Sequence, residues 1–88
     1  MSNPARLEGK LAIITGGGSG IGEATAKVFS EAGATVVVTG RRPEPLERVA
    51  KEIGGHAITC DVSDQPQVRK MFAQALQITG QIDILLNN

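Results

Sequence analysis

Five glycines, one serine and one isoleucine make up residues 16–22, between an apolar run and an amphipathic run. Glycine loses more backbone entropy on ordering than any other residue and offers no side chain for packing. A loop this rich in glycine is therefore suited to a ligand that must come close to its backbone. Because a helical pattern follows the loop, free N–H groups and the helix dipole favour an anion there, and phosphate is the usual occupant.

The spacing of the glycines distinguishes between the known phosphate loops. A P-loop framed on Gly17 and Gly22 requires Lys and then Ser or Thr, where this chain has Glu23 and Ala24. The common dinucleotide pattern G-x-G-x-x-G has no frame here, because each attempt ends on a residue other than glycine. Neither of these two loops is therefore predicted.

Two other frames fit the loop. A G-x-G-x-G frame over residues 18–22 resembles the loop of S-adenosylmethionine methyltransferases, which generally place acids before the loop and after the second strand. This chain has glycine and arginine at those places. The frame that remains is Thr-Gly, three residues, and then Gly-Ile-Gly, over residues 15–22.

Two arginines follow the second β-branched run, residues 35–39. For a loop over residues 15–22 that holds a dinucleotide, this is the place where the cofactor is selected, since an acid here binds the ribose hydroxyls and an arginine meets a 2′-phosphate. Arg41 and Arg42 stand here, and no carboxylate follows until Glu44. Guanidinium pairs with a phosphate dianion, whereas a carboxylate repels it. NADP is therefore the predicted cofactor, with NAD as the alternative.

Short connections join the runs that must position these residues. Apolar runs of strand length alternate with amphipathic runs of helical spacing, which predicts an α/β fold with a parallel sheet and right-handed crossovers. The predicted strands are 10–15, 35–39, 56–60 and 82–86, and the predicted helices start near 21, 43 and 64.

The helical runs predict which residues face the core. Ser63 or Asp64 is expected to cap the third helix, and Gly80 to end it. The residues expected to face inward are Ile21, Ala24, Val28, Phe29 and Ala32 in the first helix and Val68, Met71, Phe72, Ala75 and Leu76 in the third.

Composition excludes several classes of protein. Nine basic and nine acidic residues cancel among 88, and only two residues are aromatic, which argues against a nucleic-acid partner. Residues 1–10 carry no apolar signal core, and no apolar run approaches the roughly 20 residues of a membrane span. The single cysteine, Cys60, is expected in the core and fits a reducing compartment, so we expect the cytoplasm. No metal cluster is expected, and the lone His56 is expected on the surface.

Three motifs together resemble those of the classical short-chain dehydrogenases/reductases. Residues 15–22 match the T-G-x-x-x-G-x-G loop of that family, Asp61-Val62 its D-V step, and residues 87–88 the first half of its N-N-A-G motif. The resemblance implies a Rossmann-type βαβαβαβ sheet of strand order 3-2-1-4, truncated relative to the full doubly wound fold. Residues 1–88 are then the N-terminal part of a single NAD(P)-binding domain.

The same resemblance implies roles for individual residues. Asp61 would accept from the adenine amino group, with Val62 packed on the ring. Asn88 would contact the adenosine ribose region, while Asn87 ties its strand to neighbouring strands. The residues implied to line the pyrophosphate and ribose are Gly16, Gly18, Ser19, Gly20 and Ile21, with Gly22 allowing the helix to pack closely on the strand.

The resemblance implies an oxidoreductase that transfers hydride between a nicotinamide dinucleotide and a small carbonyl or alcohol substrate. The family's catalytic serine, tyrosine and lysine lie in a following half, and this chain contains no tyrosine. We therefore expect no catalytic residue here, and the chain alone to be inactive. The alternative is a minimal module that binds a dinucleotide, or merely folds, without catalysis. Residues 82–86 form an apolar edge strand in the implied order, which predicts a homo-oligomer.

Overall fold

The computed structural model describes residues 6–88, so the first five residues of the N-terminal stretch considered above lie outside the described residues. Strands and helices alternate as predicted. Their bounds are β1 (Leu11–Thr15), α1 (Gly20–Glu31), β2 (Thr35–Gly40), α2 (Pro43–Ile53), β3 (His56–Thr59), α3 (Gln65–Thr79) and β4 (Ile84–Leu86). Three strands are shorter than predicted at one end, since Lys10, Cys60 and residues 82–83 lie outside them.

The four strands form one parallel sheet in the order β3-β2-β1-β4, which confirms the predicted topology. In the register of β1, Ile13 lies opposite Val37 on one side and Leu85 on the other. β1 is therefore an inner strand, while β3 and β4 are the edges of the sheet within the described residues. All five residues of β1 are buried, as its apolar run predicts.

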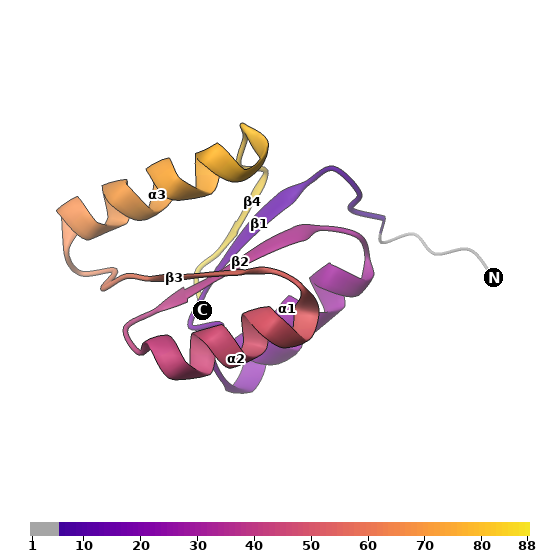
Figure 1. Ribbon diagram of the computed structural model, residues 1–88, viewed down its shortest axis with the longest axis horizontal. Coiled ribbons are helices and arrows are strands. Elements are labelled where there is room, and N and C mark those ends of the chain that lie inside the picture. The colour runs from indigo at the N-terminus through magenta and orange to yellow at the C-terminus, as the bar shows by residue number, and fades with distance from the viewer. Residues whose placement is uncertain (1–5) are drawn as a thin grey trace.

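The sheet lies between two unequal helical layers (Figure 1). Helices α1 and α2 cover one face and α3 alone covers the other, as right-handed crossovers require. The core of the first face consists of Ile14, Ala26, Ala34, Val36, Val38, Leu46, Val49 and Ala50. The core of the second consists of Leu11, Ile13, Val37, Cys60, Met71 and Ala75.

The predicted inner face of α1 is confirmed at its end, where Phe29 packs against the core and Ala32 is buried, and is wrong for the three earlier residues. Ile21 and Val28 are 75% and 58% exposed, and Ala24 is exposed as well. The buried residues of this helix are Gly22 and Ala26. Small residues face the sheet because α1 starts in direct contact with the glycine loop, which leaves no room for a large side chain there.

Helix α3 confirms its prediction at its ends and along most of its inner face, where Val68, Met71, Phe72 and Ala75 pack in the second core. Asp64, one of the two predicted caps, accepts a hydrogen bond from the Gln67 main-chain N–H, and Gly80 ends the helix with φ 86°. Leu76, predicted to face inward, is 44% exposed. It follows the buried Ala75 in the helix, and Leu85 of the short strand β4 is half exposed as well.

Candidate functional site

The ends of β1, β2 and β4 and the segment after β3 meet at the carboxyl edge of the sheet. They enclose an open cavity of about 430 Å³. In open parallel sheets this edge is where ligands bind. The cavity is lined by Thr15, Gly16, Gly40, Arg41, Cys60, Asp61, Val62, Ser63, Asn87 and Asn88.

Two smaller cavities continue along the same edge. One of about 340 Å³ lies between the glycine loop and the start of α2 and is lined by Gly16, Gly18, Ser19, Gly40, Arg41, Arg42, Pro45 and Leu46. The other, of about 210 Å³, is lined by Ile14, Ile21, Gly22, Thr25, Leu86, Asn87 and Asn88. The three cavities together bring ten of the eleven predicted site residues to one edge; Gly20 alone lines none of them.

Close approach within the glycine loop explains two of its glycines. A Cβ built on Gly22 would overlap the carbonyl oxygen of Gly16, so no larger residue fits while this contact is kept. Gly20 has φ 61°, a left-handed conformation that favours glycine, and a Cβ there would meet nothing within 4 Å. The loop therefore packs tightly against β1 at one point and leaves open space over Gly20 at another.

The first turn of α1 keeps its N–H groups free of a capping side chain. Ser19 takes the N-cap position in an extended conformation and makes no side-chain cap hydrogen bond. The first N–H groups of a helix have no partner within the helix, and they attract an anion. The loop thus fits a phosphate-bearing group both in the space over Gly20 and in its free donors.

A hydrogen-bond cluster joins the end of β1 to the end of β4. The Thr15 hydroxyl accepts from the Asn88 main-chain N–H at 2.8 Å. The same hydroxyl lies 3.1 Å from Asn87 Oδ1 and 3.3 Å from the Leu86 carbonyl oxygen, either of which accepts its proton. Thr15 is almost fully buried, so these contacts hold Asn87 and Asn88 beside the glycine loop.

Arg48 of α2 contacts the glycine loop, a contact that the sequence reasoning missed. Its Nη2 donates to the Gly18 carbonyl oxygen at 3.3 Å, and its Nη1 lies 3.3 Å from Glu23 Oε2. Lys27 pairs with the same carboxylate at 3.2 Å, as the favourable i, i+4 spacing predicts. Hydrogen bonds lower the pKa of the Glu23 carboxyl, and the one from Arg48 has a larger effect than the one from Lys27. Both cations thus offset the one acidic charge in the first turn of α1.

The segment after β3 forms a tight turn around Asp61. Asp61 Oδ1 accepts from the Ser63 hydroxyl at 2.7 Å and from the Ser63 main-chain N–H at 3.0 Å. These hydrogen bonds lower the pKa of the Asp61 carboxyl, and the positive charge of Arg41 lowers it further. Asp61 therefore carries its negative charge at neutral pH and serves both the turn and the cavity wall.

Arg41 carries the one charged side chain among the residues that line both of the two larger of these cavities, the others being Gly16 and Gly40. It is exposed and lines both the cavity beside Asp61 and the one beside the glycine loop. Arg42 takes the N-cap position of α2 and lines the second of these cavities but not the first.

Cys60 is buried, as predicted, and burial raises the pKa of its thiol, so it is a core residue with little thiolate at neutral pH.

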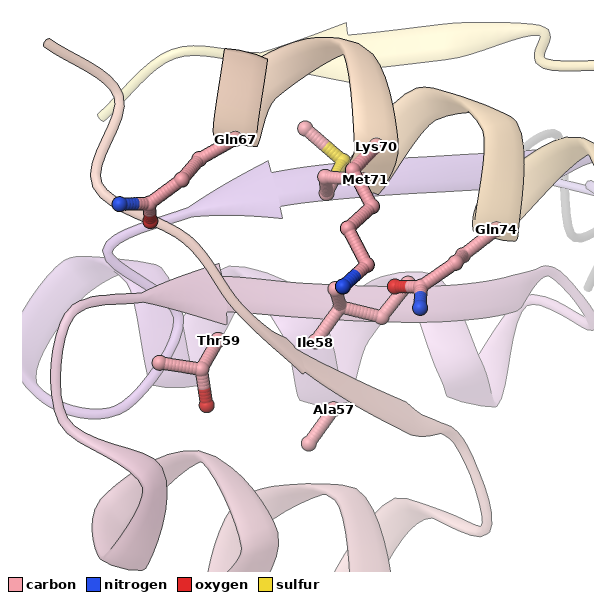
Figure 2. A pocket seen from close by; sticks show the side chains of 7 residues that line it. All are labelled: Ala57, Ile58, Thr59, Gln67, Lys70, Met71 and Gln74. Atoms are coloured by element: carbon pink, nitrogen blue, oxygen red, sulfur yellow. The ribbon is translucent and has the colours of Figure 1, made fainter. Parts of the chain in front are cut away.

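A separate cavity of about 410 Å³ lies between β3 and α3, away from the glycine loop (Figure 2). Its polar side chains are Thr59, Gln67, Lys70 and Gln74. None of the predicted site residues lines it.

Within residues 6–88, no three His, Cys, Asp or Glu side chains gather as a metal site would require, and no helix is long and apolar enough to cross a membrane.

Comparison with known proteins agrees with the geometry of this edge. The short chain dehydrogenase family model matches residues 10–88. An uncharacterised oxidoreductase of Mycobacterium bovis is 47% identical over 93% of this chain, and the mitochondrial (-)-isopiperitenol/(-)-carveol dehydrogenase of Mentha piperita is 41% identical over all of it. The chain spans 26% and 35% of the length of these two relatives.

A solved structure shows the same fold. The 3-ketoacyl-(acyl-carrier-protein) reductase of Brucella melitensis, complexed with NADH, is 46% identical and superposes with a TM-score of 0.87. The match covers 90% of this chain and 33% of that one. Since the family match covers nearly the whole sequence and extends over both the glycine loop and residues 87–88, the chain belongs to the short-chain dehydrogenase family.

Proposed function

We propose that this chain is the cofactor-binding half of a short-chain oxidoreductase and that it binds NADP at the carboxyl edge of its sheet. The observation that carries the proposal is the convergence of ten predicted site residues on three adjoining cavities. Bound there, the dinucleotide supplies hydride transfer to or from a small carbonyl or alcohol substrate. The intact protein would be an NADP-dependent dehydrogenase or reductase.

Each part of the edge has its own task in this proposal. The loop residues Gly16, Gly18, Ser19, Gly20 and Ile21 hold the pyrophosphate and the adenosine ribose with main-chain donors. Gly22 keeps α1 close to β1. Asp61 accepts from the adenine amino group and Val62 packs on the ring, while Asn88 contacts the ribose region.

NADP is favoured over NAD by the residues after β2. Arg41 and Arg42 stand where a dinucleotide fold meets the 2′ position, and Arg41 lines both neighbouring cavities. The related reductase from Brucella melitensis was solved with NADH, so NAD is the alternative to be tested. Gly40 gives a reciprocal test, because a Cβ there meets only Leu46 at ordinary contact distance, 3.6 Å. Gly40→Asp should move the preference toward NAD.

Calorimetric titration of both cofactors tests the proposal. Arg41→Ala should weaken NADP binding about ten- to hundredfold, the range for a charged hydrogen bond, and leave NAD binding nearly unchanged. Arg69→Ala, an exposed arginine of α3 that lines none of the three cavities, is the matched control. Equal losses for the two cofactors would contradict the NADP assignment, and absence of binding would contradict the site.

Catalysis needs groups that the 88 residues do not contain. With no tyrosine in the sequence, the general acid of the family has no counterpart in this chain, and we expect the chain alone to be inactive. A minimal module that binds the dinucleotide without catalysis is the second candidate. The mass of the intact polypeptide in its cell, together with its NADP-dependent reductase activity, distinguishes the two.

We also propose that the protein associates with a second copy of itself and that it is located in the cytoplasm. Leu76 and Leu85 are 44% and 50% exposed on the face that α3 covers alone, and β4 is an edge strand. Exposed apolar area beside an open edge favours pairing with a second copy. Sedimentation of the purified chain tests this, and a monomer at high micromolar concentration would contradict it. A single buried cysteine fits the reducing cytoplasm.

A further inference from the structure

The side-chain amide of Gln67 bridges the start of α3 and the turn after β3. Its Oε1 accepts from the Asp61 main-chain N–H at 2.8 Å, and its Nε2 donates to Asp64 Oδ2 at 3.0 Å. Figure 2 shows the amide directed toward the segment that links β3 to α3. Both ends of the amide are thus in use, which fixes its orientation as well as its position.

Asp61 is held from two sides as a result. Its main-chain N–H is bound by Gln67, and its Oδ1 accepts both hydrogen bonds from Ser63. Among the described residues, Oδ2 of Asp61 has no recorded hydrogen-bond partner. A carboxylate oxygen that is fixed in direction and left free is prepared to accept one more hydrogen bond, from a donor in the cavity that Asp61 lines.

Gln67 itself stands outside that cavity. It lines the separate cavity between β3 and α3, together with Gln74, seven residues further along the same helix. Of the two residues whose hydrogen bonds reach the Gln67 amide, Asp61 and Asp64, Asp61 is the one that lines the cavity at the carboxyl edge, and it is therefore the route by which Gln67 acts there.

We propose that Gln67 is a positioning residue, which aims the carboxylate of Asp61 at the exocyclic amino group of a purine. It thereby sets the preference for adenine over a purine with a carbonyl in place of that amino group. This inference rests on the proposed binding of a dinucleotide at the carboxyl edge. Adenine donates a hydrogen bond to the carboxylate, whereas the hypoxanthine carbonyl oxygen would repel it.

Titration of the intact protein with the adenine and hypoxanthine forms of the same nicotinamide dinucleotide tests the proposal. Gln67→Met keeps the length of the side chain and its helix propensity but removes both hydrogen bonds. We expect the wild type to favour the adenine form and Gln67→Met to lower that preference about tenfold, the value of one hydrogen bond to a charged group. Gln74→Met makes the same chemical change in the same cavity and should leave the preference unchanged.

A double-mutant cycle separates positioning from helix capping. Once Asp61→Ala has removed the carboxylate, Gln67→Met should cause no further loss of preference. If Gln67→Met weakens both forms equally, or lowers the preference in the absence of the Asp61 carboxylate, the positioning role is wrong.

A measurement on the ligand-free protein keeps the two proposals apart. Gln67→Met should speed hydrogen exchange at the Asp61 amide, and Gln74→Met should not. Unchanged exchange at that amide would overturn the contact on which the inference rests. A wild type that binds neither dinucleotide while its Asp61 amide responds as expected would overturn the proposed function and, with it, the role in recognition.

Discussion

The hydroxyl of Thr15 and the main-chain N–H of Asn88 form a hydrogen bond of 2.8 Å across 73 residues of sequence. It ties the strand that precedes the glycine loop to the segment that follows β4. Thr15 is buried whereas Asn88 is exposed, so the bond joins the core of the sheet to its surface edge. The walls of two cavities therefore depend on one hydroxyl group.

Thr15→Val should lower the free energy of unfolding by about 0.5–1.5 kcal/mol, the net contribution of an intramolecular hydrogen bond. The shape of the side chain is nearly kept, so the loss reports the hydroxyl group. Urea unfolding followed by circular dichroism measures it. Thr35→Val, at the half-buried start of β2, is the control and should change stability little. A midpoint equal to that of the wild type would contradict the structural role of Thr15.

Two glycines of the loop, Gly20 and Gly22, should respond differently to alanine. Gly22→Ala forces its methyl group against the Gly16 carbonyl oxygen, so we expect a loss of about 1–3 kcal/mol, as for overpacked cores. The methyl group of Gly20→Ala meets open space, so the only cost to stability is the strain of an alanine in a left-handed conformation, about 1–2 kcal/mol.

Binding should separate these two variants further. Gly20→Ala places its methyl group in the space over the loop, where the pyrophosphate is proposed to lie. We expect a folded protein that binds NADP poorly. Tight binding by Gly20→Ala would show that the phosphates lie elsewhere.

Arg48→Ala should weaken the binding of NADP and NAD alike. It removes the donor to the Gly18 carbonyl oxygen and leaves the Glu23 carboxylate less neutralised beside the loop. An exposed pair of this kind contributes modestly, and we expect a loss of about fivefold in affinity for both cofactors. Glu52→Gln removes the pairs that Lys27 and Arg48 make with Glu52 but keeps the Gly18 contact, so it should bind normally. A loss confined to NADP would show that Arg48 instead meets the 2′-phosphate.

Ser63→Ala should raise the pKa of the Asp61 carboxyl toward its ordinary value, because the hydroxyl of Ser63 is the largest cause of the lowering. A carboxyl whose folded pKa is lowered stabilises the fold above its unfolded pKa, about 3.9. That contribution is lost as the pH falls through the lower, folded pKa. NMR titration of the Asp61 carboxyl carbon in both proteins measures the shift. An identical titration curve would assign the lowering to another group.

Strand runs and cap residues were predictable because their signals are local. The β-branched run of β2 and the glycines that end α2 and α3 need no knowledge of distant contacts. The apolar residues at the start of α1 were misleading, because packing there follows from Gly22 against Gly16, a close approach that the glycine motif implied and hydrophobicity did not. Large side chains such as Ile21 were expected inside for their hydrophobicity, and close approach placed them outside.

Site residues that belong to a sequence motif or follow a strand could be predicted from the sequence. Contacts that a side chain makes with a different helix or loop could not. Arg41 and Asp61 follow strands, so the meeting of strand ends at one edge was enough to bring them together. The contact of Arg48 with the glycine loop joins residues 30 apart and depends on how α2 sits beside α1. Of this network, only its i, i+4 pairs could be identified in the sequence, Glu23 with Lys27 and Arg48 with Glu52.

The inner position of β1 also determines the order in which its two edges can be paired while the chain is being synthesised. β1 can pair with β2 early, but its other edge must wait for β4, which is made last among these elements. At the usual pace of synthesis, roughly 5–20 residues per second, that edge stays open for a few seconds. During this interval, the nascent chain exposes an apolar strand with unpaired backbone groups, a surface that chaperones recognise and other nascent chains can join. The glycine loop is thus made before β2 and β4, and its surroundings become native only when β4 has joined the sheet.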